Sequence, residues 1–226
     1  MSKCLICKEL VVAHFGWTEF LGLGKVKLIC AECEAKFEKI VGARCNGCGR
    51  ECPDSVCPDC KRWENTEYKG VLKYNRSIFH YNSFMKEVLA LYKFRGDAVL
   101  ANIFKDELKK IYSAHFQNLL VVPIPLSEKR LYERGFNQSL LLAQQLDVEI
   151  VEGLAKHETG KQSKKGRSDR MAGENHFYVA QPDVIRDKNI VLLDDIYTTG
   201  TTSRMAAIRL KDAGAKEISS LTLVRS

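Results

Sequence analysis

Apolar runs alternate with amphipathic segments over most of the chain after residue 80. These runs cover residues 118–125, 148–151, 190–193 and 218–224. The run at 190–193 is unbroken rather than alternating, which is typical of a strand buried on both faces of a parallel sheet. Apolar residues with helical spacing cover residues 82–92, 98–112, 139–146 and 203–213. Strands that alternate with helices predict an α/β fold with a twisted, mostly parallel sheet flanked by helices.

A different pattern comes before this region. Two extended, aromatic-rich runs, 68–74 and 77–81, flank the polar pair Asn75-Arg76. Two such runs around a short polar connection predict a β-hairpin. Asn82 or Ser83 then offers an N-cap for the first helix.

The strongest chemical signal follows the apolar run at 190–193, where Asp194 and Asp195 stand side by side. Residues 198–202 then form a loop of threonines and glycine in front of an amphipathic segment. Small residues let backbone N–H groups crowd around an anion, and a helix N-terminus adds its positive dipole end. We therefore expect a sugar phosphate held with a divalent cation, and a strand that ends in a solvated turn is the simpler alternative. The strand ends at Pro125 and Asp195 should face one crevice, because parallel sheets bind ligands beyond the carboxyl ends of their strands.

A hydrophobic run that ends in two acids also occurs in P-loop ATPases. Such an enzyme needs G-x-x-x-x-G-K-[ST] between a strand and a helix. The nearest approach is residues 155–162, where Ala155 replaces the first glycine and Gln162 replaces the final Ser or Thr. The sequence therefore excludes an ATPase of this class.

The cysteines define a separate N-terminal module. All nine precede residue 61, and eight form four C-x-x-C pairs: Cys4/Cys7, Cys30/Cys33, Cys45/Cys48 and Cys57/Cys60. In a reducing compartment such pairs bind metal far more often than they form disulfides, and two pairs complete a tetrahedral site for structural zinc. We therefore expect two zinc ions in a zinc-ribbon-like module at 1–64, ahead of a second domain at 65–226. The simplest pairing joins the first pair with the second and the third with the fourth, and a cross-braced pairing stays open.

Chain length and composition limit the size of the core and the expected location of the protein. The 226 residues suffice for one substantial core plus a small module. No run of about eighteen apolar residues exists, so no membrane insertion is expected, and Met1-Ser2-Lys3-Cys4 lacks the apolar core of a signal peptide. A cytoplasmic location is the default expectation. The net charge of +7 is concentrated partly in residues 156–170, which contain six basic and two acidic residues.

Residues 190–202 resemble the signature of the type I phosphoribosyltransferases, which use phosphoribosyl pyrophosphate (PRPP). The resemblance implies the type I phosphoribosyltransferase fold for the second domain, with PRPP and Mg²⁺ bound at this motif. It implies that Asp194 and Asp195, the candidate catalytic residues, hold the ribose hydroxyls. The residues implied to wrap the 5′-phosphate are Thr198, Thr199, Gly200, Thr201 and Thr202. Tyr197 stands where an aliphatic residue is usual, and we expect its ring to affect the fit of the ribose.

The wider layout is similar to the ComF family over nearly the full chain. The likeness rests on the C-x-x-C pairs and on residues 93–97, 122–126, 130 and 133–138. In related transferases the loop after the Val-Pro-x-Pro strand binds pyrophosphate, which makes Arg130, Arg134 and Asn137 the candidates here. The family's flexible lid maps to Thr159, Gln162 and Arg170.

The family resemblance implies a competence protein for natural transformation. Such a protein handles incoming single-stranded DNA together with an ATP-dependent helicase of the ComFA type. The basic residues 156–170, the zinc module and the rings of Tyr74, Phe79 and Tyr81 offer charge and stacking for this contact, although rings in a hairpin are more often core residues. The alternative is an active phosphoribosyltransferase, a glycosyltransferase acting on PRPP, that modifies an unidentified acceptor without direct DNA contact.

Overall fold

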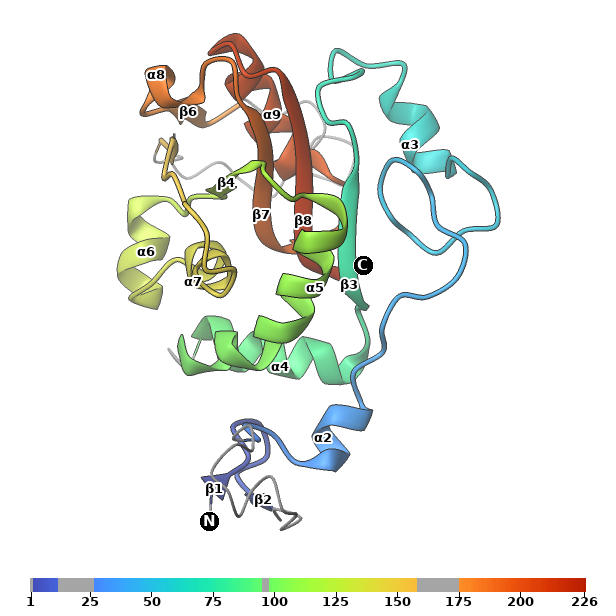
Figure 1. Cartoon of the computed structure of the whole chain (residues 1–226), viewed down its shortest axis with the longest axis vertical. Helices are drawn as coiled ribbons and strands as arrows, with labels where there is room; N and C mark the ends of the chain where they lie inside the picture. Colours follow the sequence, from blue (N-terminus) through green and yellow to red (C-terminus); the bar gives the residue numbers. More distant parts are fainter. Residues whose placement is uncertain (1, 12–26, 95–97, 158–174) are drawn as a thin grey trace.

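The computed structural model describes residues 2–11, 27–94, 98–157 and 175–226. Its centre is a parallel sheet of four strands in the order β3-β8-β7-β4 (Figure 1). The strands are β3 (Asn75–His80), β8 (Glu217–Arg225), β7 (Asn189–Tyr197) and β4 (Leu120–Pro123). In register, Leu193 of β7 lies between Pro123 of β4 and Leu221 of β8. The predicted α/β class with a parallel sheet is confirmed.

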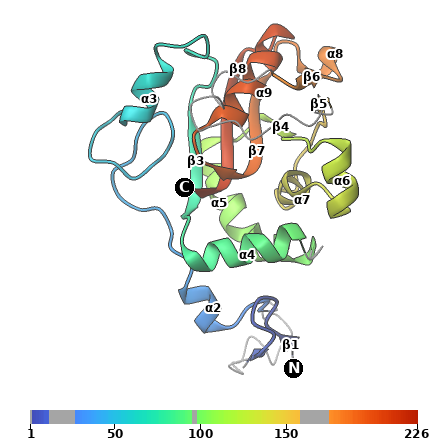
Figure 2. The ribbon, with the colours of Figure 1, turned by 180° about the vertical axis from the view of Figure 1, so that it is seen from behind.

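Helices cover both faces of this sheet. They are α4 (Ser83–Phe94), the 3-10 helix η1 (Ala98–Phe104), α5 (Lys105–His115), α7 (Gln138–Gln144) and α9 (Thr201–Asp212). Helix α5 lies in front of the sheet in Figure 1, and α9 lies in front of it in the reverse view of Figure 2. Among the helices of the described segments, none combines the length and apolarity that a membrane crossing requires.

The two helical layers enclose two cores. The larger core is formed with α4, η1, α5 and α7 and contains Val191 and Leu193 of β7. The smaller core lies under α9 and contains Ile190 and Leu192. Alternate residues of β7 thus face opposite layers, which explains why its sequence is an unbroken apolar run.

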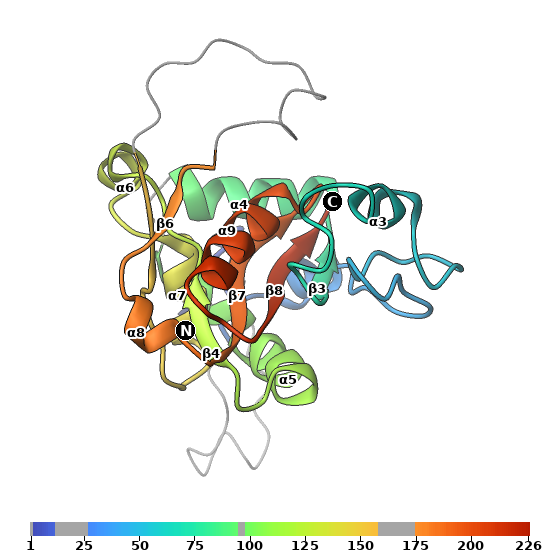
Figure 3. The same ribbon diagram turned by 90° about the horizontal axis from the view of Figure 1, so that it is seen from above.

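Smaller elements surround one side of this sandwich. Helix α6 (Glu128–Arg134) follows β4, and an antiparallel pair, β5 (Leu154–Lys156) and β6 (Phe177–Val179), leads to the short helix α8 (Pro182–Ile185). Seen from above, these elements lie beyond β4, and α3 (Pro58–Trp63) lies on the opposite side beyond β3 (Figure 3).

The cysteine-rich region contacts the sheet domain at two separate places. Strands β1 (Ser2–Lys3) and β2 (Leu10–Val11) and helix α2 (Ala31–Ala35) lie next to α4, whereas α3 lies beside β3 (Figure 1). The domain boundary near residue 64 stays a prediction.

The predicted hairpin at residues 68–81 is wrong. Only β3 forms there, and it pairs in parallel with β8. Asn75, expected in the turn, is fully buried and accepts a hydrogen bond from Ser220 Oγ at 2.8 Å, while its amide donates to Cys48 O at 3.1 Å. Partners from distant parts of the chain thus turn a typical turn residue into the first residue of a strand.

Two further boundaries differ from the expectation. Residues 148–151 form only an isolated bridge between Ile150 and Val121 instead of a strand. Strand β7 continues past the acids to Tyr197, because β8 pairs with it as far as Arg225. Helix α4 is capped at its N-terminus as expected, since Asn82 Oδ1 accepts a hydrogen bond from the Met85 N–H at 2.8 Å.

Candidate functional site

The two acids, which we term the acid pair, lie near the carboxyl end of β7 and have different partners. The Asp194 carboxylate accepts hydrogen bonds from Ser139 Oγ at 3.0 Å and from the Asp195 N–H at 2.9 Å. The Asp195 carboxylate forms an ion pair with Lys93 Nζ at the end of α4. Burial, reinforced by the charge of Asp195, raises the pKa of Asp194 to about 7. The acid pair thus combines one carboxylate held by a cation with one that titrates near neutral pH.

Residues 198–202, the phosphate loop, connect β7 to α9. The side chains of Thr198, Thr199 and Thr202 are exposed. Gly200 has a φ of +83°, and a Cβ there would collide with the Tyr197 hydroxyl and the Arg204 guanidinium. Only glycine therefore fits this position. The first N–H groups of α9 have no acceptor within the helix, so the loop and the helix start together could bind an anion.

Three cationic side chains lie on one side of the acid pair. Arg130 and Arg134 belong to α6, and Lys156 belongs to β5. Arg134 donates to Gln138 Oε1 at 2.9 Å. Burial and then the like charge of Arg130 lower the pKa of Arg134, and the acid pair opposes this shift. Burial and Arg130 also lower the pKa of Lys156, while Asp194 raises it. Arg130 therefore acts electrostatically on both Arg134 and Lys156, and the three charges suit a polyanion beside the acids.

Asn137 is already engaged by the protein. Its Oδ1 caps α7 by accepting from the Ser139 N–H at 3.0 Å, and its amide donates to Ile124 O at 3.1 Å. These contacts bring the loop after β4 to the start of α7 and so place Ser139 against Asp194. Contact of Asn137 with pyrophosphate stays a prediction. The predicted lid residues Thr159, Gln162 and Arg170 lie outside the described residues.

Three side chains at this site were not assigned a role from sequence. Lys93 lies in the 93–97 motif and Lys156 begins the basic stretch, so the sequence drew attention to both residues. It did not indicate that either side chain would lie beside the acid pair. Ser139 had none, because a serine at the start of a helix is ordinary. The structure brings all three close to the acid pair through α4, β5 and α7.

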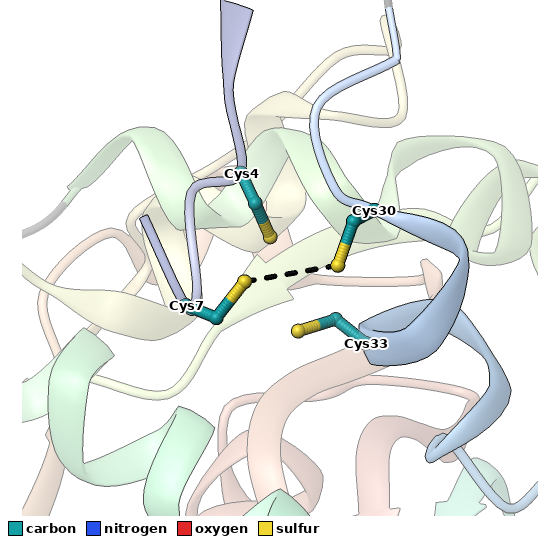
Figure 4. A group of neighbouring side chains, drawn as sticks. All are labelled: Cys4, Cys7, Cys30 and Cys33. Atoms are coloured by element: carbon teal, nitrogen blue, oxygen red, sulfur yellow. Dashed lines mark hydrogen bonds between the residues drawn. The ribbon is translucent and has the colours of Figure 1, made fainter. Parts of the chain in front are cut away.

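The cysteine pairs meet in the simplest predicted order. Cys4, Cys7, Cys30 and Cys33 form the first cluster, and Cys45, Cys48, Cys57 and Cys60 form the second, with all four sulfurs of each within 4.8 Å of one another. Figure 4 shows the four side chains of the first cluster converging on one point. The cross-braced pairing does not occur.

Both clusters have the geometry of a zinc site. The Sγ atoms of Cys7 and Cys30 are 3.7 Å apart, and those of Cys48 and Cys57 are 3.5 Å apart. Tetrahedral zinc with Zn–S bonds of about 2.3 Å requires sulfurs roughly 3.8 Å apart. Each cluster can therefore hold one zinc ion in a closed structural site. Cys52 belongs to neither cluster.

Tyr197 lies below the phosphate loop and against the second cysteine cluster. It is buried among the cysteines of the second cluster, and its hydroxyl accepts from Arg204 at 2.7 Å. The expectation that its ring shapes the ribose pocket is therefore wrong. The aromatic residue is explained instead by its contact with the second cluster.

The sequence of this chain is similar to those of several known proteins. Residues 133–226, which contain the acid pair and the phosphate loop, match the family model described as a phosphoribosyl transferase domain. The chain is 39% identical to competence protein ComFC of Bacillus subtilis strain 168, covering 99% of this chain and 95% of that protein. It is 36% identical to competence protein ComFC of Streptococcus pneumoniae, covering 99% of this chain and 100% of that protein. Competence protein F of Haemophilus influenzae is 26% identical, covering 88% of this chain and 90% of that protein.

Proposed function

The chain belongs to the ComF family, and from that premise we propose that it acts in natural competence, binds PRPP with Mg²⁺ and contacts incoming single-stranded DNA. Similarity to competence proteins over nearly the whole length supports the competence role. A cytoplasmic setting and a helicase of the ComFA type as partner are parts of the same proposal.

The observation that carries PRPP binding is the position of the acid pair directly before the phosphate loop on β7 and α9. In this proposal the loop N–H groups bind the 5′-phosphate, while Asp194 and Asp195 accept hydrogen bonds from the ribose hydroxyls. A monophosphate and a vicinal diol are therefore recognised by neighbouring parts of one strand-to-helix connection.

The cations described above complete the site in this proposal. Arg130, Arg134 and Lys156 neutralise the pyrophosphate of PRPP, and Mg²⁺ bound with the substrate would add further positive charge there. If transfer occurs, positive charge develops at the anomeric carbon as pyrophosphate leaves. The acid pair then stabilises that charge, and the cations stabilise the leaving group.

We propose that both cysteine clusters hold zinc, giving two structural ions per chain. Each cluster supplies four thiolates, so no coordination position is left for water or substrate. Zinc in this proposal orders the chain and takes no part in phosphoribosyl chemistry.

A surface beside the PRPP site suits single-stranded DNA. Tyr132 on α6 is 92% exposed, and the exposed Lys129 lies one turn before it on the same face of this short helix. An exposed ring beside cations can stack on a base while the charges hold the backbone. Of the three rings considered from sequence, Phe79 is buried in the larger core and Tyr74 stacks on Phe116, whereas Tyr81 is 41% exposed.

Titration calorimetry with PRPP and Mg²⁺ tests the proposal directly. We expect the wild-type protein to bind PRPP and the double variant Asp194→Ala/Asp195→Ala to show no binding. Equal heats for both proteins would contradict the assigned site. A parallel assay for pyrophosphate release, with bases, amines and nucleic acids as acceptors, separates the two functions: turnover without any DNA affinity would favour the phosphoribosyltransferase alternative.

A further inference from the structure

Trp63 connects the second cysteine cluster to the phosphate loop. It is the last residue of α3 and is only 4% exposed. Its indole Nε1–H donates to the backbone carbonyl of Thr199 at 3.0 Å, across 136 positions of sequence. The carbonyl and the next N–H of a trans peptide point in opposite directions, so this bond aims the Gly200 N–H away from Trp63. One of the N–H groups expected to bind phosphate is thus oriented from outside the loop.

Arg204 extends this contact along the base of the loop. Its guanidinium stacks on the Trp63 indole at 4.5 Å, donates to the Tyr197 hydroxyl at 2.7 Å and lies 3.5 Å from Gly200 O. Arg204 is 6% exposed, so these contacts form away from water. A buried guanidinium with these contacts is well suited to keep two rings and a loop carbonyl in one arrangement.

The same network reaches the cysteine sulfurs. Arg225 stacks on Tyr197 at 5.1 Å, donates to Tyr197 O at 3.2 Å and lies 3.8 Å from Cys48 Sγ. Helix α3 itself begins directly after Cys57 and contains Cys60. The position of Trp63 therefore depends on two cysteines of the second cluster.

We propose that metal in the second cluster sets the conformation of the phosphate loop, with Trp63 as the positioning residue. This inference rests on the proposed function in one respect, namely that the loop binds the 5′-phosphate. The first cluster packs against Phe84 of α4 instead. Loss of metal from the second cluster should therefore disturb the PRPP site, whereas loss from the first should leave it intact.

The sharpest variant is Trp63→Phe, which keeps a ring for Arg204 to stack on but removes the N–H. Two readouts are needed: hydrogen exchange of residues 198–203 without any ligand, and PRPP affinity by calorimetry. We expect faster exchange in the loop and about tenfold weaker PRPP binding, as for the loss of one hydrogen bond. Tyr68→Phe is the matched control, because Tyr68 packs edge-on against the Trp63 ring at 5.6 Å and makes no part of the loop.

The metal itself is tested by comparing Cys45→Ser/Cys57→Ser with Cys4→Ser/Cys7→Ser. Only the first of these variants should accelerate exchange in the loop and weaken PRPP binding. Equal effects of the two variants, or unchanged exchange and affinity in Trp63→Phe, would overturn the inference. If the wild-type protein fails to bind PRPP while Trp63→Phe and Cys45→Ser/Cys57→Ser still change loop exchange, the connection stands and the proposed ligand is wrong.

Discussion

Lys93 Nζ, at the end of α4, forms an ion pair with the carboxylate of Asp195 near the end of β7. The two side chains are only 19% and 11% exposed. Charges this far from water are stable only when they are paired. The ion pair therefore connects the first helix of the sheet domain to the centre of the proposed PRPP site.

Lys93→Met should destabilise the fold, because it leaves the Asp195 carboxylate without its cation. We expect a loss of about 3 kcal/mol in the free energy of unfolding, the usual effect of removing one partner of a buried pair. Urea denaturation measures it. Lys93→Met/Asp195→Asn should recover part of the loss, and Lys86→Met, at an exposed position of the same helix, should change stability by less than about 0.5 kcal/mol. Additive effects of the two substitutions would contradict a direct pair.

The raised pKa of Asp194, about 7, predicts two pH effects. The folded protein holds this proton more tightly than the unfolded chain, so the contribution of Asp194 to stability is greatest below about pH 4 and falls as the pH rises towards 7. Ribose hydroxyls and Mg²⁺ favour the ionised form, so PRPP affinity should rise over the same interval. Denaturation midpoints and calorimetry from pH 5 to 8 measure both effects, and Asp194→Asn should flatten both profiles. A wild-type profile that matches that of Asp194→Asn would contradict the assignment.

Local sequence signals predicted the parts of the site that depend on neighbours along the chain. The β7 run, the acid pair and the glycine of the phosphate loop follow from apolar run length, charge and backbone freedom, and the cysteine pairs follow from ligand spacing. Contacts between distant segments were not predictable. Asn75 became a strand residue through Ser220, Tyr197 turned towards the second cluster, and Trp63 reached Thr199, because burial against remote partners outweighed local preference.

Gly200→Ala should impair the phosphate loop for two reasons: the strain of a positive φ and the collision of the new Cβ with neighbouring side chains. The new Cβ would meet the Tyr197 hydroxyl and the Arg204 guanidinium at a φ of +83°. Gly70→Ala is the matched control, since Gly70 has a φ of +69° and nothing within 4 Å of the added Cβ. We expect Gly70→Ala to cost about 1 kcal/mol of stability, and Gly200→Ala to cost more and to abolish PRPP binding. Equal stabilities of the two variants would show that the space under the loop is not restrictive.

Elemental analysis should find two zinc ions per chain in the purified protein. Cys4→Ser/Cys7→Ser and Cys45→Ser/Cys57→Ser should each retain one ion, because each breaks one closed Cys4 site. Cys52→Ser should retain two, since Cys52 lies outside both clusters. Zinc content near zero in the folded wild-type protein would refute the assignment of both clusters.

Single-stranded DNA should bind at α6 through the exposed ring of Tyr132 and the cation of Lys129 one turn before it. Tyr132→Ala should reduce affinity by about 1–3 kcal/mol, the usual contribution of one base stacked on an aromatic residue. The logarithm of the binding constant should fall linearly with the logarithm of salt concentration, and Lys129→Ala should reduce that slope by about 0.7, as for one phosphate contact on a single strand. Fluorescence anisotropy with a labelled oligonucleotide measures both quantities. Tyr81, which is 41% exposed and follows β3, provides the comparison: a larger loss in Tyr81→Ala than in Tyr132→Ala would place the DNA near β3 and contradict binding at α6.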